Sequence, residues 1–245
     1  MKEITSVKKS IEIQASPEKV WQALTIPSIR NQWETKSCEI DLVVGGRMYL
    51  DYGWNVTYDG IITEIEVNKR LVLEGSDKQL TIWSIESQAQ SSIVTIEYTG
   101  LWAGDIGFMQ MENMMFGTYQ FMRNFKSVLE ETGDIRHTFW QSWIGMNHCT
   151  VNYEDRTAIK VVQVIADTPA YGLLKEEDLI LSLNDVSITC YDDFERMITE
   201  APNQAIQLNV IRDGVASTVR LTTIPYGSRV APSTSLSNCR EYSRL

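Results

Sequence analysis

The chain has 245 residues, a formal net charge of −10 and a hydrophobic content of 43% that includes seven tryptophans. This length fits two ordinary domains or one large one, and this much apolar material excludes a wholly disordered chain. The acidic balance disfavours a nucleic-acid backbone or an anionic membrane as the main partner. No stretch approaches the roughly 18 apolar residues of a membrane span, so none is predicted.

The N-terminus and the cysteines both favour a cytoplasmic location. Residues 1–10 are charged and lack the apolar region of an export signal. The four cysteines, Cys38, Cys149, Cys190 and Cys239, are scattered without the spacing of metal ligands. Without an export signal, such cysteines are expected to be reduced thiols. We therefore predict a cytoplasmic protein with no metal site at its cysteines.

The first region of the chain opens with a strand and a short helix. Ile11 and Ile13 alternate with polar residues, which is the period of a strand. Ser16 can cap the free amides of a helix that begins at Pro17. Glu18 suits the positive end of the helix dipole. These residues predict a strand followed directly by a capped helix.

A run of strands and one long helix follow. The predicted strands are separated by Gly, Asn and Asp turns and cover residues 40–44, 47–52, 58–67, 70–74, 80–86 and 92–98. Methionine and aromatic residues at helical spacing predict a helix over 110–131, which Thr132 and Gly133 end. An antiparallel sheet that curls around a long helix leaves a cavity between the two.

Several motifs follow one another in this region: SPEKVWQAL at 16–24, Trp33, GGRM at 45–48, DGIITEI at 59–65 and RLV at 70–72. Together they resemble the SRPBCC (START-like) superfamily, in the branch related to the activator of Hsp90 ATPase. Their order and spacing carry the resemblance, which covers nearly all of residues 5–132. The resemblance implies an α+β helix-grip domain over residues 1–133, in which an antiparallel sheet wraps the C-terminal helix and encloses an apolar pocket.

Aromatic residues on these predicted elements are the candidate lining of that pocket. They are Trp33, Tyr49, Trp54, Trp83, Tyr98, Phe116 and Phe121. The functional interpretation is a cavity for an apolar small molecule, oriented by a polar group from Glu34, Asp59 or Glu64. The alternative for most of the aromatic residues is simple packing, and the alternative for the three carboxylates is a solvated turn or sheet edge.

A different pattern begins after a connector over residues 134–141. The predicted strands cover residues 158–165, 179–183, 206–212 and 217–223. Phe194, Met197 and Ile198 are the buried face of a helix predicted over 192–200.

Short motifs follow one another in this region: DTPA at 167–170, GLL at 172–174, EDLI at 177–180, LND at 183–185 and the turn RDG at 212–214. Their order over residues 142–226 resembles a PDZ domain of the bacterial type. Trp143, Glu177 and Asp185 depart from the family pattern, which has glycine at each of these positions. The resemblance implies a small, mostly β domain that binds the C-terminal end of another polypeptide.

The resemblance assigns the peptide site to one loop, one strand and one helix. The loop amides would form an anion nest for a terminal carboxylate, and the strand from Met146 would pair with the ligand backbone. The candidate peptide-binding residues are Trp143, Ile144, Gly145, Met146, Asn147, His148, Tyr191, Phe194 and Ile198. The alternative is a PDZ-shaped module in which Ile144 and Met146 are ordinary core residues and nothing binds.

Residues 227–245 are predicted to be a flexible tail, because they are rich in Ser and Arg and lack any period. The last residues, Ser243, Arg244 and Leu245, match the Ser-x-Leu pattern that class I PDZ domains recognise. We therefore hypothesise that they bind the chain's own groove or that of a neighbouring copy. Chance is the alternative, since so short a pattern arises often.

Catalytic signatures are largely absent from the sequence. His137 and His148 are its only histidines, and it contains no HExxH, GxSxG or Cys/His metal cluster. No cofactor is predicted. The sequence favours a non-enzymatic adaptor, whose first domain binds an apolar small molecule or a protein surface and whose second domain binds a C-terminal peptide. Two alternatives remain: an SRPBCC-type enzyme (a cyclase, dehydratase or hydrolase) acting on a hydrophobic small molecule, and a co-chaperone-like regulator.

Overall fold

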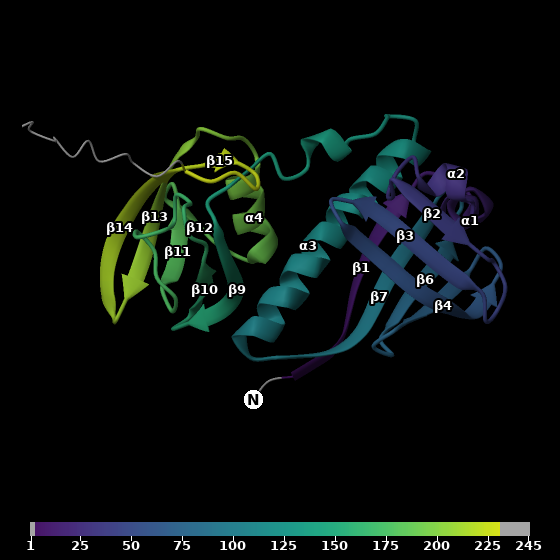
Figure 1. The fold of residues 1–245 in the computed structure, drawn as a ribbon, viewed down its shortest axis with the longest axis horizontal. Helices are drawn as coiled ribbons and strands as arrows, with labels where there is room; N and C mark the ends of the chain where they lie inside the picture. Colours follow the sequence, from purple (N-terminus) through teal and green to yellow (C-terminus); the bar gives the residue numbers. More distant parts are fainter. Residues whose placement is uncertain (1–2, 231–245) are drawn as a thin grey trace, which may run out of the picture.

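The computed structural model describes residues 3–230, which form two halves with one long helix between them (Figure 1). The first half is built on a sheet of seven strands, and the second half is smaller and mostly β. The helix α3 (Gly104–Leu129) follows the last strand of the first sheet and packs against both halves. The antiparallel sheet with a long helix after it, and then a mostly β region, confirms the predicted fold class.

The first sheet is antiparallel throughout and has the spatial order β1-β7-β6-β5-β4-β3-β2. Two helices, α1 (Pro17–Thr25) and α2 (Pro27–Arg30), connect its first two strands. The strands are β1 (Glu3–Ile13), β2 (Ser37–Ile40), β3 (Arg47–Gly53), β4 (Val56–Glu66), β5 (Arg70–Gly75), β6 (Leu80–Ser87) and β7 (Ser92–Ala103). Ser16 caps α1 as predicted, because its side chain accepts a hydrogen bond from the amide of Lys19.

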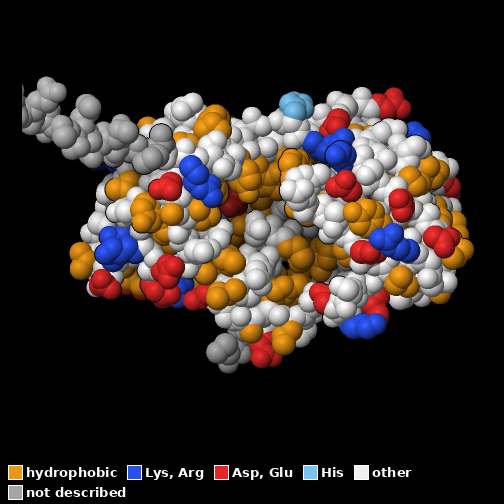
Figure 2. All heavy atoms as spheres, viewed as in Figure 1, with side chains coloured by type: hydrophobic (Ala, Val, Ile, Leu, Met, Phe, Trp, Pro, Cys, Tyr) orange, Lys and Arg blue, Asp and Glu red, His pale blue; other side chains and the backbone are white. Residues whose placement is uncertain are grey.

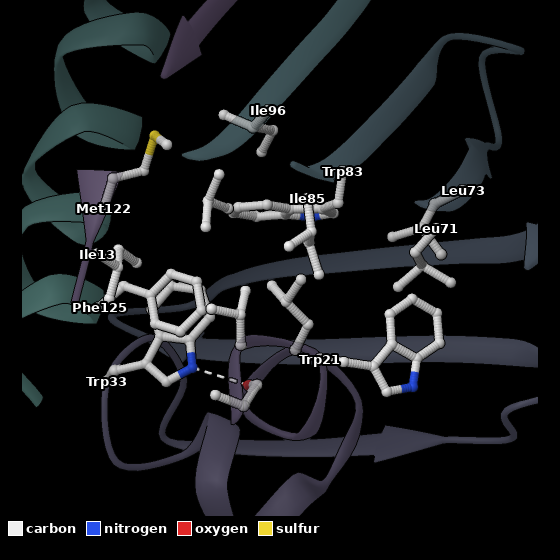
Figure 3. Packing of buried hydrophobic residues seen from close by; sticks show 14 of the residues in the cluster. Ile13, Trp21, Trp33, Leu71, Leu73, Trp83, Ile85, Ile96, Met122 and Phe125 are labelled. Carbon is white, nitrogen blue, oxygen red and sulfur yellow. Dashed lines mark hydrogen bonds between the residues drawn. The ribbon is translucent and has the colours of Figure 1, made fainter. Parts of the chain in front are cut away.

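Trp33 is one of the largest side chains of the first core and packs beside Phe125 (Figure 3). Its ring is fully buried and stacks on Phe125 of α3, with 4.1 Å between the ring centroids. Trp83 from β6 meets both rings edge-on. The indole Nε1 of Trp33 donates to the carbonyl oxygen of Ala23 at 2.9 Å, and Asn124 of α3 donates to the carbonyl oxygen of Trp33 at 2.7 Å. These contacts fix α3 to the α1–α2 segment and the sheet.

The second half is a sheet with the order β14-β13-β11-β10-β9, so that β9 is an edge strand. A connector that contains the 3-10 helix η1 (Arg136–Thr138) leads into it. Its elements are β8 (Ser142–Trp143), β9 (Met146–Tyr153), β10 (Arg156–Val164), β11 (Leu179–Leu183), β12 (Val186–Ser187), α4 (Tyr191–Thr199), β13 (Ala205–Arg212), β14 (Val215–Thr222) and β15 (Ile224–Pro225). This half has a hydrophobic core of its own, centred on Phe194 and the inner faces of β10, β11 and β13.

The prediction of a strand over residues 40–44 was wrong. The strand β2 ends at Ile40, and the chain turns over residues 43–46, where the amide of Gly46 donates to the carbonyl oxygen of Val43. Leu42, Val43 and Val44 are 38%, 53% and 66% exposed. These three apolar residues match the composition of a strand. The Gly-Gly pair that follows them allows the chain to turn before a strand of that length forms.

Within residues 3–230, no helix is long and apolar enough to cross a membrane. Cys38, Cys149 and Cys190 are free thiols. Cys239 and the proposed self-ligand Ser243, Arg244 and Leu245 lie outside the described residues.

Candidate functional sites

The first candidate site is a cavity of about 870 Å³ between the first sheet and α3. Trp33 and Trp83 line its inner end, Tyr98 lines a side wall, and Phe121 of α3 covers it. Trp54, at the tip of the β3–β4 hairpin, is 72% exposed and lies at the mouth. The face of the molecule between the two halves is hollowed, and hydrophobic side chains gather there (Figure 2). These five aromatic residues lie where the sequence predicted a cavity lining.

Three residues of a polar cluster, Glu34, Tyr52 and Tyr58, also line this cavity. Arg30, almost fully buried, donates to Glu34 from Nε at 2.6 Å and to the carbonyl oxygen of Leu24 from Nη1 at 2.7 Å. The hydroxyl of Tyr52 donates to Glu34 at 3.4 Å, whereas the buried hydroxyl of Tyr58 has no partner among residues 3–230. Burial raises the pKa of both phenols, so they stay protonated, and the Tyr58 hydroxyl is free to donate to a ligand.

Tyr49 and Phe116 do not line this cavity, so these two predictions were wrong. Tyr49 lies on the opposite face of β3 from the buried Met48 and Leu50, where the Arg47 guanidinium lies over its ring. Strand alternation is the reason, since successive side chains face opposite sides of a sheet. Phe116 turns away from the sheet towards the second half and meets the ring of Tyr191 edge-on at 6.2 Å.

Among the three candidate carboxylates, only Glu34 reaches the cavity. Asp59 pairs with Arg47 at 2.8 Å, and both side chains are more than half exposed. Glu64 pairs with Arg70 at 2.9 Å and is half exposed. Both are therefore solvated sheet carboxylates, which was the alternative interpretation.

The second candidate site is a pocket of about 190 Å³ at the start of β9. Residues from the loop, the strand and α4 line it, as the resemblance implied: Trp143, Ile144, Gly145, Met146, Asn147, His148, Tyr191 and Ile198. Phe194 does not line it, because its ring is fully buried in the core of the second half. Among residues 3–230, the amides of Ile144 and Gly145 donate to no acceptor.

Gly145 gives this loop its shape. Its φ of +84° lies in the left-handed region, and a Cβ at this position would lie 2.1 Å from the side chain of Thr168. The carbonyl oxygen of Gly145 accepts hydrogen bonds from the amide of Ile165 and the hydroxyl of Thr168. The carbonyl group of Gly145 therefore points towards Ile165 and Thr168. The amides of Ile144 and Gly145 are left without a hydrogen-bond acceptor among residues 3–230.

A buried polar cluster forms the floor of the pocket. The His148 ring is 1% exposed, stacks on Tyr191 at 4.6 Å, and has neither nitrogen hydrogen-bonded within the described residues. Its Nε2 lies 3.6 Å from a carboxylate oxygen of Glu195 on α4. Burial lowers the pKa of His148 to about 3 and raises the pKa of Glu195 to about 7, so both groups favour their neutral forms.

Two family models match the chain, one for each half. Residues 14–130 match the model described as activator of Hsp90 ATPase homolog 1-like protein (AHSA1), and residues 142–223 match the PDZ domain. The chain joins an AHSA1-like domain to a PDZ domain. The family resemblances predicted from the sequence are therefore confirmed.

Solved structures similar to the AHSA1-like domain share little sequence identity with it. The Aha1 dimer from Colwellia psychrerythraea is 22% identical, over 52% of this chain and 97% of that chain, with a TM-score of 0.45. An AHSA1-like protein from Aeromonas hydrophila is 24% identical, over 51% of this chain and 94% of that chain, with a TM-score of 0.43. No curated protein matches this chain.

The sequence did not predict that α3 contributes to the PDZ pocket. Met109, Gln110 and Asn113 line the pocket opposite the loop. Glu112 lies on the same side of the helix and accepts a hydrogen bond from the amide of Thr150 in β9. The signal in the sequence is a second stripe on α3, at 109, 112–113 and 116, on the side away from its own sheet.

His137 lies in the connector at the edge of an open groove between the domains and does not line the PDZ pocket. Within residues 3–230, no cluster of three or more His, Cys, Asp or Glu side chains is arranged to hold a metal ion.

Proposed function

We propose that this protein is an adaptor that binds the free C-terminus of a partner polypeptide in its PDZ pocket. The observation that carries the proposal is the pair of unoccupied amides at Ile144 and Gly145, next to the edge strand β9. Successive amides of a turn form a concavity that binds anions, and a carboxylate at a chain end is such an anion. An edge strand can add a peptide strand through main-chain hydrogen bonds.

The pocket lining fits an apolar terminal residue followed by a more polar one. Met146 and Ile198 supply apolar surface beside the amides, whereas Asn147, His148 and Glu195 lie further along β9 and α4. Buried polar groups such as the imidazole of His148 need a hydrogen-bonding partner, which the side chain of a bound peptide would supply.

Peptides of matched sequence with either a free carboxylate or a C-terminal amide test this proposal directly. Fluorescence polarisation with the full chain, using a library randomised at its last positions, should find free-acid peptides that bind at least about 10-fold tighter than their amides. This control leaves the protein unchanged, which matters because any side chain at Gly145 would collide with Thr168. Equal binding of the acids and the amides would refute the proposal.

A second candidate function, binding of an apolar small molecule by the AHSA1-like domain, is favoured by the size of the cavity under α3. A volume of about 870 Å³ lies within the range of ligand sites, and aromatic side chains make most of its wall. The Tyr58 hydroxyl and the Glu34 carboxylate, which pairs with the buried Arg30, line this cavity and suit a ligand with one polar group.

Uptake of an uncharged hydrophobic dye such as Nile red tests the second function. Gly117 faces this cavity from α3, and a Cβ there would be in ordinary contact with Trp140 at 3.6 Å. We expect Gly117→Leu to fill part of the cavity and reduce dye fluorescence while the circular dichroism spectrum is retained. Unchanged dye binding in this variant would place the dye elsewhere.

A further inference from the structure

The free edge of β9, where a peptide strand would add, is covered by α3. The helix packs along β9, and the carboxylate of Glu112 accepts a hydrogen bond from the amide of Thr150 at 2.7 Å. Main-chain groups alternate between the two edges of a strand. The amides of Met146 and His148 therefore point to the same edge as that of Thr150, and Glu112 already holds one of the donors that a peptide would use.

Side chains of α3 also cover the groove between β9 and α4. Phe116, one turn after Glu112, is 1% exposed and packs on Tyr191 at the start of α4. Met109 and Asn113 line the pocket that remains beside the loop. As a result, His148 on the groove floor is only 1% exposed although β9 is an edge strand.

The space that remains is too small for an extended peptide. A pocket of about 190 Å³ is smaller than the roughly 300 Å³ at the lower end of ordinary ligand pockets. That volume accommodates about one terminal residue beside the amides of Ile144 and Gly145. Strand addition needs several residues along β9, and α3 occupies their positions.

We propose that α3 is an internal ligand of the PDZ groove, and that a partner's C-terminus binds only after α3 has moved away from β9. This inference rests on the proposed peptide-binding function. In a closed–open equilibrium, the apparent dissociation constant is the intrinsic constant divided by the open fraction. The affinity for a partner is therefore set by the contacts that hold α3 on β9.

Two ion pairs flank this interface without entering the peptide groove. Lys9 of β1 pairs with Asp192 at the start of α4 at 2.8 Å, and Asp105 at the start of α3 pairs with Lys160 of β10 at 2.7 Å. They hold the AHSA1-like domain against the PDZ domain at both ends of the buried stripe formed by Glu112 and Phe116.

The test compares peptide binding to the wild-type chain and to Glu112→Ala. Removing the acceptor of the Thr150 amide should favour the open state and tighten the binding of free-acid peptides by about 10-fold, because hydrogen bonds to charged groups are among the stronger ones. Phe116→Ala should act in the same direction. Ile106→Ala is the matched control, because Ile106 lies on the same helix but is 63% exposed. Amide hydrogen exchange at Thr150 gives a second readout and should accelerate in Glu112→Ala.

The outcomes separate the two proposals. Tighter binding and faster exchange in Glu112→Ala, with wild-type behaviour of Ile106→Ala, support the internal-ligand proposal. Carboxylate-dependent binding that is equally strong in the wild type, in Glu112→Ala and in Phe116→Ala would overturn the internal-ligand proposal. It would leave the peptide-binding function standing. No carboxylate-dependent binding to any of the proteins would overturn both.

Discussion

The two candidate sites lie on opposite sides of α3 and differ in how they are built. The cavity of the AHSA1-like domain is large, and its walls are mostly the domain's own sheet and helix. The PDZ pocket is less than a quarter of that volume and takes part of its wall from the other domain. Met114, Gly117, Thr118 and Phe121 face the cavity, whereas Met109 and Gln110 face the pocket. One helix thus carries two functional stripes.

This difference separates the expected effects of substitutions. The side chains that line the first cavity also belong to the hydrophobic core of the domain. Most substitutions among them should therefore lower the free energy of unfolding. Walls of the PDZ pocket that come from α3 belong to a contact between domains, so changes there should alter binding more than folding. Asn113, Trp140 and Tyr226 line both the cavity and the PDZ pocket. The two spaces therefore adjoin at these side chains.

The largest effect is expected inside the first cavity, from Trp33→Ala. Trp33 is fully buried and stacks on Phe125, and removal of such a ring costs about 3–5 kcal/mol of unfolding free energy. Trp54→Ala is the matched control at the mouth of the same cavity, where the side chain is 72% exposed, and should change stability by less than about 0.5 kcal/mol. Urea unfolding followed by far-UV circular dichroism measures both. Similar losses of unfolding free energy in the two variants would show that the buried wall at Trp33 and the mouth at Trp54 do not differ in this way.

A smaller, pH-dependent effect is expected on the PDZ side, from Glu195→Gln. Burial raises the pKa of Glu195 to about 7 from 4.5, so between these values the folded state keeps a proton that the unfolded state has lost. Its contribution to stability therefore falls as pH rises through this window, and the amide variant avoids the loss. We expect the stability of Glu195→Gln relative to the wild type to rise by about 2–3 kcal/mol from pH 5 to pH 8.

Thermal unfolding at each pH measures this difference. The lowered pKa of His148 gives stability the opposite slope between about pH 3 and 6.5, but that contribution is present in both proteins and cancels in the comparison. Glu200→Gln, a change at an exposed position just after α4, is the control and should show no trend. A constant difference between Glu195→Gln and wild type across this range would mean that Glu195 is ionised throughout.

The sequence predicted local structure better than contacts between the domains. Ser16, the aromatic core around Trp33 and the loop at Gly145 follow from caps, periods and motifs that involve nearby residues. The side of Tyr49 also follows from strand alternation against Met48 and Leu50, so this error was avoidable.

The role of Phe116 could not be predicted in the same way. Helical spacing places Phe116 on a stripe of α3. It does not show which surface packs against that stripe, because this depends on how the two domains dock. Glu112 shares this stripe, but helical spacing alone does not give its role, which arises only where the amide of Thr150 meets its carboxylate. The residues that control access to the PDZ groove therefore lie in the other domain's helix.

The smallest effect is expected from the ion pairs at the domain contact. Lys9 and Asp192 are each a little over one quarter exposed, and pairs of this kind contribute about 0.2–1 kcal/mol. Lys9→Gln should therefore tighten peptide binding about 2-fold, and part of this gain should disappear at high salt, where the wild-type pair is screened. Lys78→Gln is the matched control, since it makes the same charge change at the remote and more exposed Lys78–Glu74 pair.

Polarisation titrations of a free-acid peptide at low and high salt measure these differences. If Lys9→Gln and Lys78→Gln shift the affinity equally at both salt concentrations, net charge alone accounts for the change. The Lys9–Asp192 pair would then have no part in holding α3 on β9, and closure would rest on Glu112 and Phe116.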